Sequence, residues 1–229
     1  MLNFPVVSWQ INTKTFTLQI SLLLMTFSAV AQIQFEQVPS SPEPQNMVDF
    51  EGVDYSSIAF ADVDGDGDED VLITGQNASN ERIAKLYSND GDGNFTEVTG
   101  TPFDGVGDSS IAFADVDGDG DQDVLITGSN SSNDRIAKLY KNDGEGNFAK
   151  VTVTPFDGVT GGSIAFADVD GDSDQDVLIT GRNTSNQRIA KLYTNDGDGN
   201  FTEVTGTPFD GVRDSSIAFA DVDGDGDQE

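Results

Sequence analysis

Hydrophobic residues along the chain fall into short runs that are separated by polar, glycine-rich segments. The runs SIAFADV, DVLITG, RIAKLYS and NFTEVTG follow one another between residues 57 and 100, and all are rich in β-branched and aromatic residues. None is long enough for a stable helix, and the gaps are clusters of Asn, Asp, Ser and Gly that are typical of hairpin loops. The pattern predicts four antiparallel strands in succession.

The four-strand pattern repeats along the chain. The segment ADVDGDGDED contains Asp62, and the corresponding aspartates are Asp115, Asp168 and Asp221, each 53 residues after the one before. A short repeat cannot bury its own apolar face, so neighbouring copies must share a core. Four strands in roughly 40 to 50 residues are typical of a β-propeller blade. We therefore expect an all-β fold of propeller-type blades, with about three whole blades in an open arc that is a fragment of a larger propeller.

The repeat divides the chain into segments. We predict a signal peptide at 1–31, an N-terminal outer strand and linker at 32–55, blade repeats at 56–108, 109–161 and 162–214, and a truncated fourth repeat at 215–229. The signal peptide is indicated by Lys14, the apolar run FTLQISLLLMTFSAV and the Ala-Val-Ala sequence before Gln32. This run is shorter than the roughly 20 apolar residues of a membrane span. We expect a secreted or surface-exposed protein with no membrane insertion after cleavage.

The composition restricts the partners and the chemistry. The chain has 41 acidic and 11 basic residues, a formal net charge of -30, and neither Cys nor His. This charge repels phosphates and anionic lipids, so we expect no nucleic-acid partner. Without Cys or His, thiolate chemistry, zinc sites of the usual kind and His-dependent catalysis are excluded. The acidic residues belong to repeated loops, whereas a catalytic carboxylate pair would be expected once, so we predict that the protein is not an enzyme.

The segment DVDGDGDED has the spacing of a metal-binding loop. Alternating carboxylates in a tight loop can converge on a hard cation, and calcium takes six to eight oxygen ligands. Asp62, Asp64 and Asp66 would supply side-chain oxygens at positions 1, 3 and 5, and Asp68 its backbone carbonyl. Gly67 at position 6 would adopt positive φ. Magnesium fits less well because it retains several waters, so we predict Ca²⁺.

The loop and the DVLITG strand after it resemble the FG-GAP/VCBS repeats of integrin α-subunit propellers and many secreted bacterial proteins. The resemblance covers residues 33–229 and implies a structural calcium between the first two strands of each blade, with about three well-formed sites and an incomplete fourth. The implied ligands are Asp62, Asp64, Asp66 and Asp70 in the first loop, Asp115, Asp117, Asp119 and Asp123 in the second, and Asp168, Asp170, Asp172 and Asp176 in the third. The backbone carbonyls of Asp68, Asp121 and Asp174 add to these sets, and Asp221, Asp223 and Asp225 form the fourth.

Two loops depart from the pattern. Ser173 replaces glycine at position 6 of the third loop, which predicts strain and weaker calcium binding there. The fourth loop has Glu229 at position 9 and no second strand after it, so we expect this site to be empty or poorly ordered.

These features predict a calcium-binding repeat scaffold for adhesion or for interaction with an extracellular protein or glycan. Calcium would stabilise each blade in place of the disulfides that are common in exported proteins. The alternatives are a lectin-like carbohydrate-binding module and the non-catalytic propeller part of a secreted polysaccharide-active enzyme. Aromatic residues recur once per blade, and their burial tendency favours a place in the core over a sugar platform: Tyr87, Tyr140, Tyr193, Phe103, Phe156 and Phe209.

A second acidic segment, NDGDGN at residues 89–94, also alternates acids with glycine. It could form a weaker metal loop, but Asn-Asp-Gly is ordinary turn chemistry. We predict a hairpin turn.

Overall fold

The computed structural model describes residues 50–222 and 228. The predicted signal peptide, residues 32–49 of the predicted N-terminal outer strand and linker, and Asp223, Asp225 and Glu229 of the fourth loop lie outside these residues. Within the described part of the chain, no helix is long and apolar enough to cross a membrane.

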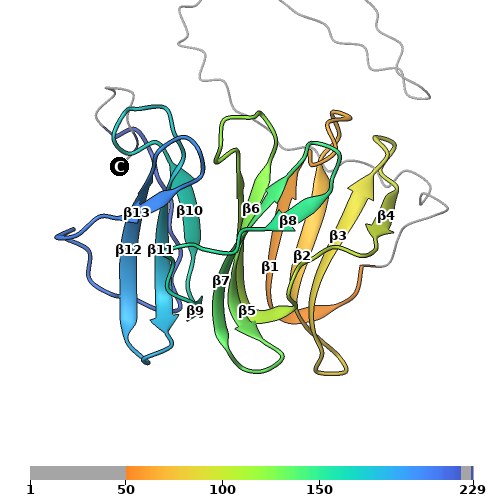
Figure 1. Ribbon diagram of the computed structural model, residues 1–229. Coiled ribbons are helices and arrows are strands. Elements are labelled where there is room, and N and C mark those ends of the chain that lie inside the picture. Colours follow the sequence, from red (N-terminus) through yellow and green to blue (C-terminus); the bar gives the residue numbers. More distant parts are fainter. Residues whose placement is uncertain (1–49, 223–227, 229) are drawn as a thin grey trace, which may run out of the picture. The chain divides into compact units, whose positions relative to one another are not determined.

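The three repeats form three antiparallel blades, of four strands in the first two repeats and of five in the third, where the first strand is divided in two; this all-β arrangement confirms the predicted fold class. Figure 1 shows them as successive groups of strands, coloured from orange through green to blue. The first blade contains β1 (Val53–Ala61), β2 (Asp70–Asn77), β3 (Arg82–Asn89) and β4 (Phe95–Val98). The second contains β5 (Val106–Ala114), β6 (Asp123–Asn130), β7 (Arg135–Asn142) and β8 (Phe148–Lys150). The third contains β9 (Val159–Thr160), β10 (Ile164–Ala167), β11 (Asp176–Asn183), β12 (Arg188–Asn195) and β13 (Phe201–Glu203).

The second strand of each blade is its most buried element. The first six residues of β2, β6 and β11 are all buried, because a neighbouring strand lies on each side and other apolar groups cover both faces. The run DVLITG therefore has three consecutive apolar residues at its centre and does not alternate between apolar and polar positions.

The first strand of each blade is bent by an irregularity. The pairing of β1 with β2 shifts register between Asp54 and Ser57, where Tyr55 has φ 51°. In the third repeat, Gly161 has φ 59° at the same place, and the strand is divided into β9 and β10. Since β9 also pairs with β7, through Ile136 and Val159, a hydrogen-bonded path joins the second and third blades into one nine-stranded sheet. The repeat pattern did not predict this link.

Neighbouring blades share their hydrophobic core, as the repeat argument predicted. Ala61, Leu72 and Leu86 of the first blade lie in one buried cluster with Ile126 and Tyr140 of the second. The same cluster recurs one blade later.

The recurring tyrosines belong to this core. Tyr140 and Tyr193 are fully buried, and each receives an edge-on contact from the phenylalanine of the preceding linker, Phe103 or Phe156, at ring-centroid distances of 5.1 and 5.0 Å. Phe209 differs, because 45% of it is exposed.

Candidate metal centres

Each acidic loop connects the first and second strands of a blade and is pinned by the aspartate at position 9. Asp123 is 1% exposed, and its two carboxylate oxygens accept the backbone N–H groups of Val116 (3.2 Å) and Asn142 (2.8 Å). Asp70 and Asp176 make the same pair of bonds in their own blades. From the sequence, position 9 was predicted only as a metal ligand. The structure adds an anchor, because the carboxylate ties the start of the loop to the end of the third strand.

The aspartate at position 1 folds the loop around itself. Asp62 accepts the N–H of Gly65 on one oxygen (2.8 Å) and that of Gly67 on the other (3.0 Å), and the other two loops repeat both bonds. This wrapping requires a left-handed residue at position 6, where φ is 93° at Gly67, 95° at Gly120 and 77° at Ser173. The predicted positive φ at position 6 is confirmed, including at the serine.

The wrapped loops bring three carboxylates together. Within the described residues, ligand oxygens lie within 4.8 Å of one another in three groups. These groups are Asp62, Asp64 and Asp66; Asp115, Asp117 and Asp123; and Asp168, Asp170 and Asp176. Positions 1 and 3 are therefore common to all three loops, whereas the third member comes from position 5 in the first loop and from position 9 in the others.

The remaining aspartates of the predicted sets make local contacts. Asp119 and Asp172 at position 5 accept the N–H of the residue two places later, at 3.0 Å in both loops. At position 7 the carboxylate lies against a glycine of the turn between the third and fourth strands. A Cβ on Gly91, for example, would lie 2.3 Å from Asp68 Oδ2. Asp121 and Asp174 lie in the same way against the matching glycines.

The aspartate at position 9 of each loop is held where its negative charge is unfavourable. Burial raises the pKa of Asp123 to about 6, with a further increase from Asp117, although its two backbone hydrogen bonds act in the opposite direction. Burial also raises the pKa of Asp70 and Asp176. At Asp121, burial and then the neighbouring loop carboxylates raise the pKa. A bound cation would act in the opposite direction and lower the pKa of these carboxylates.

One carboxylate oxygen tests whether these residues fit a metal ion. Asp117 Oδ1 is buried and has no hydrogen-bond partner. An unpartnered buried acceptor costs free energy, and Asp117 is one of the three converging residues of the second loop, whose carboxylate oxygens are ligands of the kind that hard divalent cations prefer. The donor set and this orphaned oxygen therefore fit calcium.

The second acidic segment, NDGDGN, is a self-contained turn. Asp90 Oδ1 accepts the N–H groups of Asp92 (3.0 Å) and Asn94 (3.1 Å), and Oδ2 accepts the side-chain amide of Asn94 (2.8 Å). These bonds, with that from the Asn94 side chain the largest, lower the pKa of Asp90. The carboxylate is satisfied by its own turn, in agreement with the predicted hairpin.

The turn of one blade also positions the acidic loop of the blade before it. Asn142 Nδ2 donates to the Val63 carbonyl at 2.8 Å, and Asn195 Nδ2 donates to the Val116 carbonyl at the same distance. Both bonds are buried. These asparagines were missed in the sequence, where the only signal is an Asn at the start of every turn.

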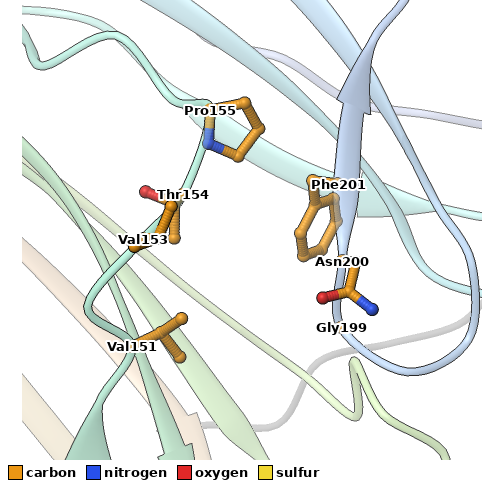
Figure 2. A pocket seen from close by; sticks show the side chains of 7 residues that line it. All are labelled: Val151, Val153, Thr154, Pro155, Gly199, Asn200 and Phe201. Carbon is orange, nitrogen blue, oxygen red and sulfur yellow. The ribbon is translucent and has the colours of Figure 1, made fainter.

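A small groove lies at each of the two junctions between blades. Figure 2 shows the groove of about 350 Å³ at the second junction, where Val153, Thr154 and Pro155 of the linker face Asn200 and Phe201 of the third blade. A smaller groove at the first junction is lined by the equivalent segments, residues 98–102 and 146–148. The groove therefore repeats with the blade.

An all-β repeat protein whose blades each carry a carboxylate-rich loop is the class that this fold and these sites define. The sequence pattern of the FG-GAP-like repeat matches residues 62–126, 115–179 and 168–229. The chain belongs to this family.

The chain was also compared with solved structures and with curated protein sequences. A fucose lectin from Kordia zhangzhouensis, solved in complex with methyl-fucoside, matches at 13% identity and a TM-score of 0.43, over 66% of this chain and 99% of that chain. No curated protein sequence matches the chain significantly.

Proposed function

We propose that this FG-GAP-like chain is a secreted or cell-surface calcium-binding scaffold that acts in adhesion or in binding an extracellular protein or glycan. The observation that supports the proposal best is the convergence of three carboxylates in each of three loops. Only oxygen donors are present in these groups, and calcium is the hard cation that loops of this kind bind.

The residues that would hold the ion are those of positions 1 and 3, with position 5 or 9 as the third carboxylate. A bound cation would supply the positive charge that offsets the repulsion among them, which reaches roughly 4 kcal/mol for two carboxylates about 4 Å apart at an effective dielectric near 20. The Asn142 side chain joins the first loop to the second blade. Fixing a loop would therefore also stabilise the junction between blades.

The extracellular location is proposed from the sequence and from the calcium affinity that is typical of extracellular modules. Extracellular calcium modules bind at roughly 0.1 to 1 mM, a range suited to the calcium concentration outside cells. The proposed export signal at residues 1–31 agrees with this setting. We propose no catalytic activity, because the clustered acids repeat with the blades.

Calcium titration tests the proposal. The chain should take up calcium saturably, and at ten times the dissociation constant each site should stabilise the fold by about 1.4 kcal/mol. Three such sites would add roughly 4 kcal/mol, so excess EGTA should lower the melting temperature clearly. A chain in which Asp62, Asp115 and Asp168 are all replaced by Asn is the control, since it should lose the effect of EGTA. Absence of saturable uptake at millimolar calcium would refute the proposal.

Glycan binding is the second candidate, and the groove at each junction favours it. The groove combines the hydroxyl of Thr154 and the amide of Asn200 with the apolar side chains of Val153 and Pro155, a mixture of polar and apolar groups that suits a sugar. The recurring tyrosines are buried and are not available to stack on one. A glycan array with and without calcium separates this function from a purely protein-binding scaffold, because only the lectin function gives a saturable signal on the array.

A further inference from the structure

The three acidic loops differ at one place that lies outside the loops themselves. Lys141, the last residue but one of β7, stands where the first blade has Ser88 and the third has Thr194. It brings a positive charge to the second loop alone, since both equivalent residues are neutral.

Lys141 makes two polar contacts that link two blades. Its Nζ lies 2.7 Å from Asp117 Oδ2 and donates to the backbone carbonyl of Asp198 at 3.0 Å. The second contact crosses to the turn of the third blade, where the lysine side chain passes over Gly199, so close that a Cβ there would lie 2.8 Å from Nζ. The side chains of Lys141 and Asp117 are only 31% and 19% exposed. Solvent therefore screens this ion pair less than a surface pair.

The lysine contacts a carboxylate of the proposed metal ligand set. Asp117 is one of the three converging residues of the second loop, and its other oxygen is the buried one that has no hydrogen-bond partner. A calcium ion on that oxygen would lie beside the ammonium group on the same carboxylate, and the two cations would repel each other. In the first loop, the corresponding contact is a long one, 3.5 Å, from the neutral Ser88 Oγ to Asp64 Oδ2.

We propose that Lys141 is an internal counter-cation that makes the second loop the weaker calcium site relative to the first and that holds the second and third blades together when calcium is absent. This inference rests on the proposed calcium binding and deepens it. The three loops then do not act as equal sites: the first loop responds to calcium, whereas the second is held in part by the chain's own ammonium group.

Calcium titration followed by NMR resolves the loops separately. The backbone amides of Gly65 and Gly67 report on the first loop, and those of Gly118 and Gly120 report on the second. In the wild-type chain, the calcium midpoint of the second loop should be at least about tenfold higher than that of the first. Lys141→Thr, which introduces the residue of the third blade, should bring the two midpoints together. Lys150→Thr removes the same charge from an exposed position of β8 and should leave the difference unchanged.

The reverse substitution keeps the inference testable if Lys141→Thr does not fold. Ser88→Lys places an ammonium group beside Asp64 and should raise the midpoint of the first loop by a similar factor. Without calcium, Lys141→Thr should also lower the melting temperature more than Lys150→Thr does. Equal midpoints in the wild-type chain, or a difference that survives Lys141→Thr, would overturn the role proposed for Lys141 but not the proposed calcium binding. Loops that all fail to respond to calcium would overturn this inference and the proposed function together.

Discussion

Each blade has two acidic, glycine-rich connections, and they use the same residue types in opposite ways. In the turn between the third and fourth strands, Asp90 directs both oxygens to donors of its own turn. In the loop between the first and second strands, three carboxylates converge on one another, and the position-9 aspartate, which is one of the three in the second and third loops, is buried. The pKa of Asp90 is lowered by its hydrogen bonds, whereas that of Asp70 is raised by burial.

This difference shows that acidic composition alone does not make a metal site. Both segments alternate Asp with Gly. In the turn, however, both oxygens of Asp90 already accept hydrogen bonds from N–H groups of the turn itself. The loop gathers its charges because position 1 wraps the backbone and position 9 fixes its end to the next strand. A cation site therefore depends on where the strands hold the two ends of the loop.

The acidic loops and the turns should change the free energy of unfolding with pH in opposite directions, and this is the largest effect that we expect. In the presence of EGTA, the folded-state pKa of Asp123, raised to about 6, exceeds its unfolded value of 3.8. The folded chain then binds more protons between about pH 4 and pH 6, so the stability from this group is present at low pH and lost as the pH rises through 6. The shift corresponds to about 3 kcal/mol. Asp70 and Asp176 act in the same direction.

The turns should act in the opposite direction and at lower pH. The pKa of Asp90, Asp143 and Asp196 is lowered by hydrogen bonds, so their contribution is present above about pH 4 and lost below it. Urea unfolding between pH 3 and pH 7 in EGTA measures both. Saturating calcium should remove the loss between pH 4 and pH 6, because calcium binds the ionised carboxylate. A metal-free chain that becomes more stable from pH 4 to pH 6 would contradict the assignment.

Removal of the buried anchor should have the next largest effect. Asp123→Ala leaves the N–H groups of Val116 and Asn142 without their acceptor, at a cost of about 1 to 3 kcal/mol each. Relief from burying a charge offsets part of this, so we expect a net loss of about 2 kcal/mol in the free energy of unfolding at pH 7. Asp143→Ala in the exposed turn of the same blade is the matched control and should cost clearly less. Equal losses in urea unfolding would mean that position 9 is not an anchor.

The fold was largely predictable because its signals are local. Strand runs, turn residues and the 53-residue period specify four strands per repeat, and the wrapping of Asp62 around Gly67 specifies the positive φ at position 6. The parts that were not predicted depend on packing between blades. Neither the buried bond from Asn142 to Val63 nor the contact of Lys141 with Asp198 has a local signature, because each joins residues of different repeats.

The bond between blades should be worth more than its equivalent within a blade. Asn142→Ala removes the buried donor to the Val63 carbonyl, and we expect a loss of about 1 to 2 kcal/mol. Asn89→Ala is the control, because Asn89 Nδ2 donates instead to the Glu69 carbonyl in its own blade at an exposed position. Hydrogen exchange should show faster opening of the first acidic loop in Asn142→Ala only. If both variants lose the same stability, the asparagine does not couple neighbouring blades.

The smallest expected effect comes from position 6, where the third loop has a serine and the first and second loops have a glycine. Ser173 has φ 77°, where a side chain is strained, while Gly67 and Gly120 adopt φ 93° and 95° at the same position without that cost. Ser173→Gly should therefore raise the free energy of unfolding by about 0.5 to 1 kcal/mol, and Gly120→Ser should lower it by a similar amount. Because the N–H of residue 173 already donates to Asp168 (2.9 Å), the gain should appear in EGTA as well as in calcium. A gain seen only with calcium would instead assign the serine an effect on the metal site, since relief of backbone strain does not depend on the ion.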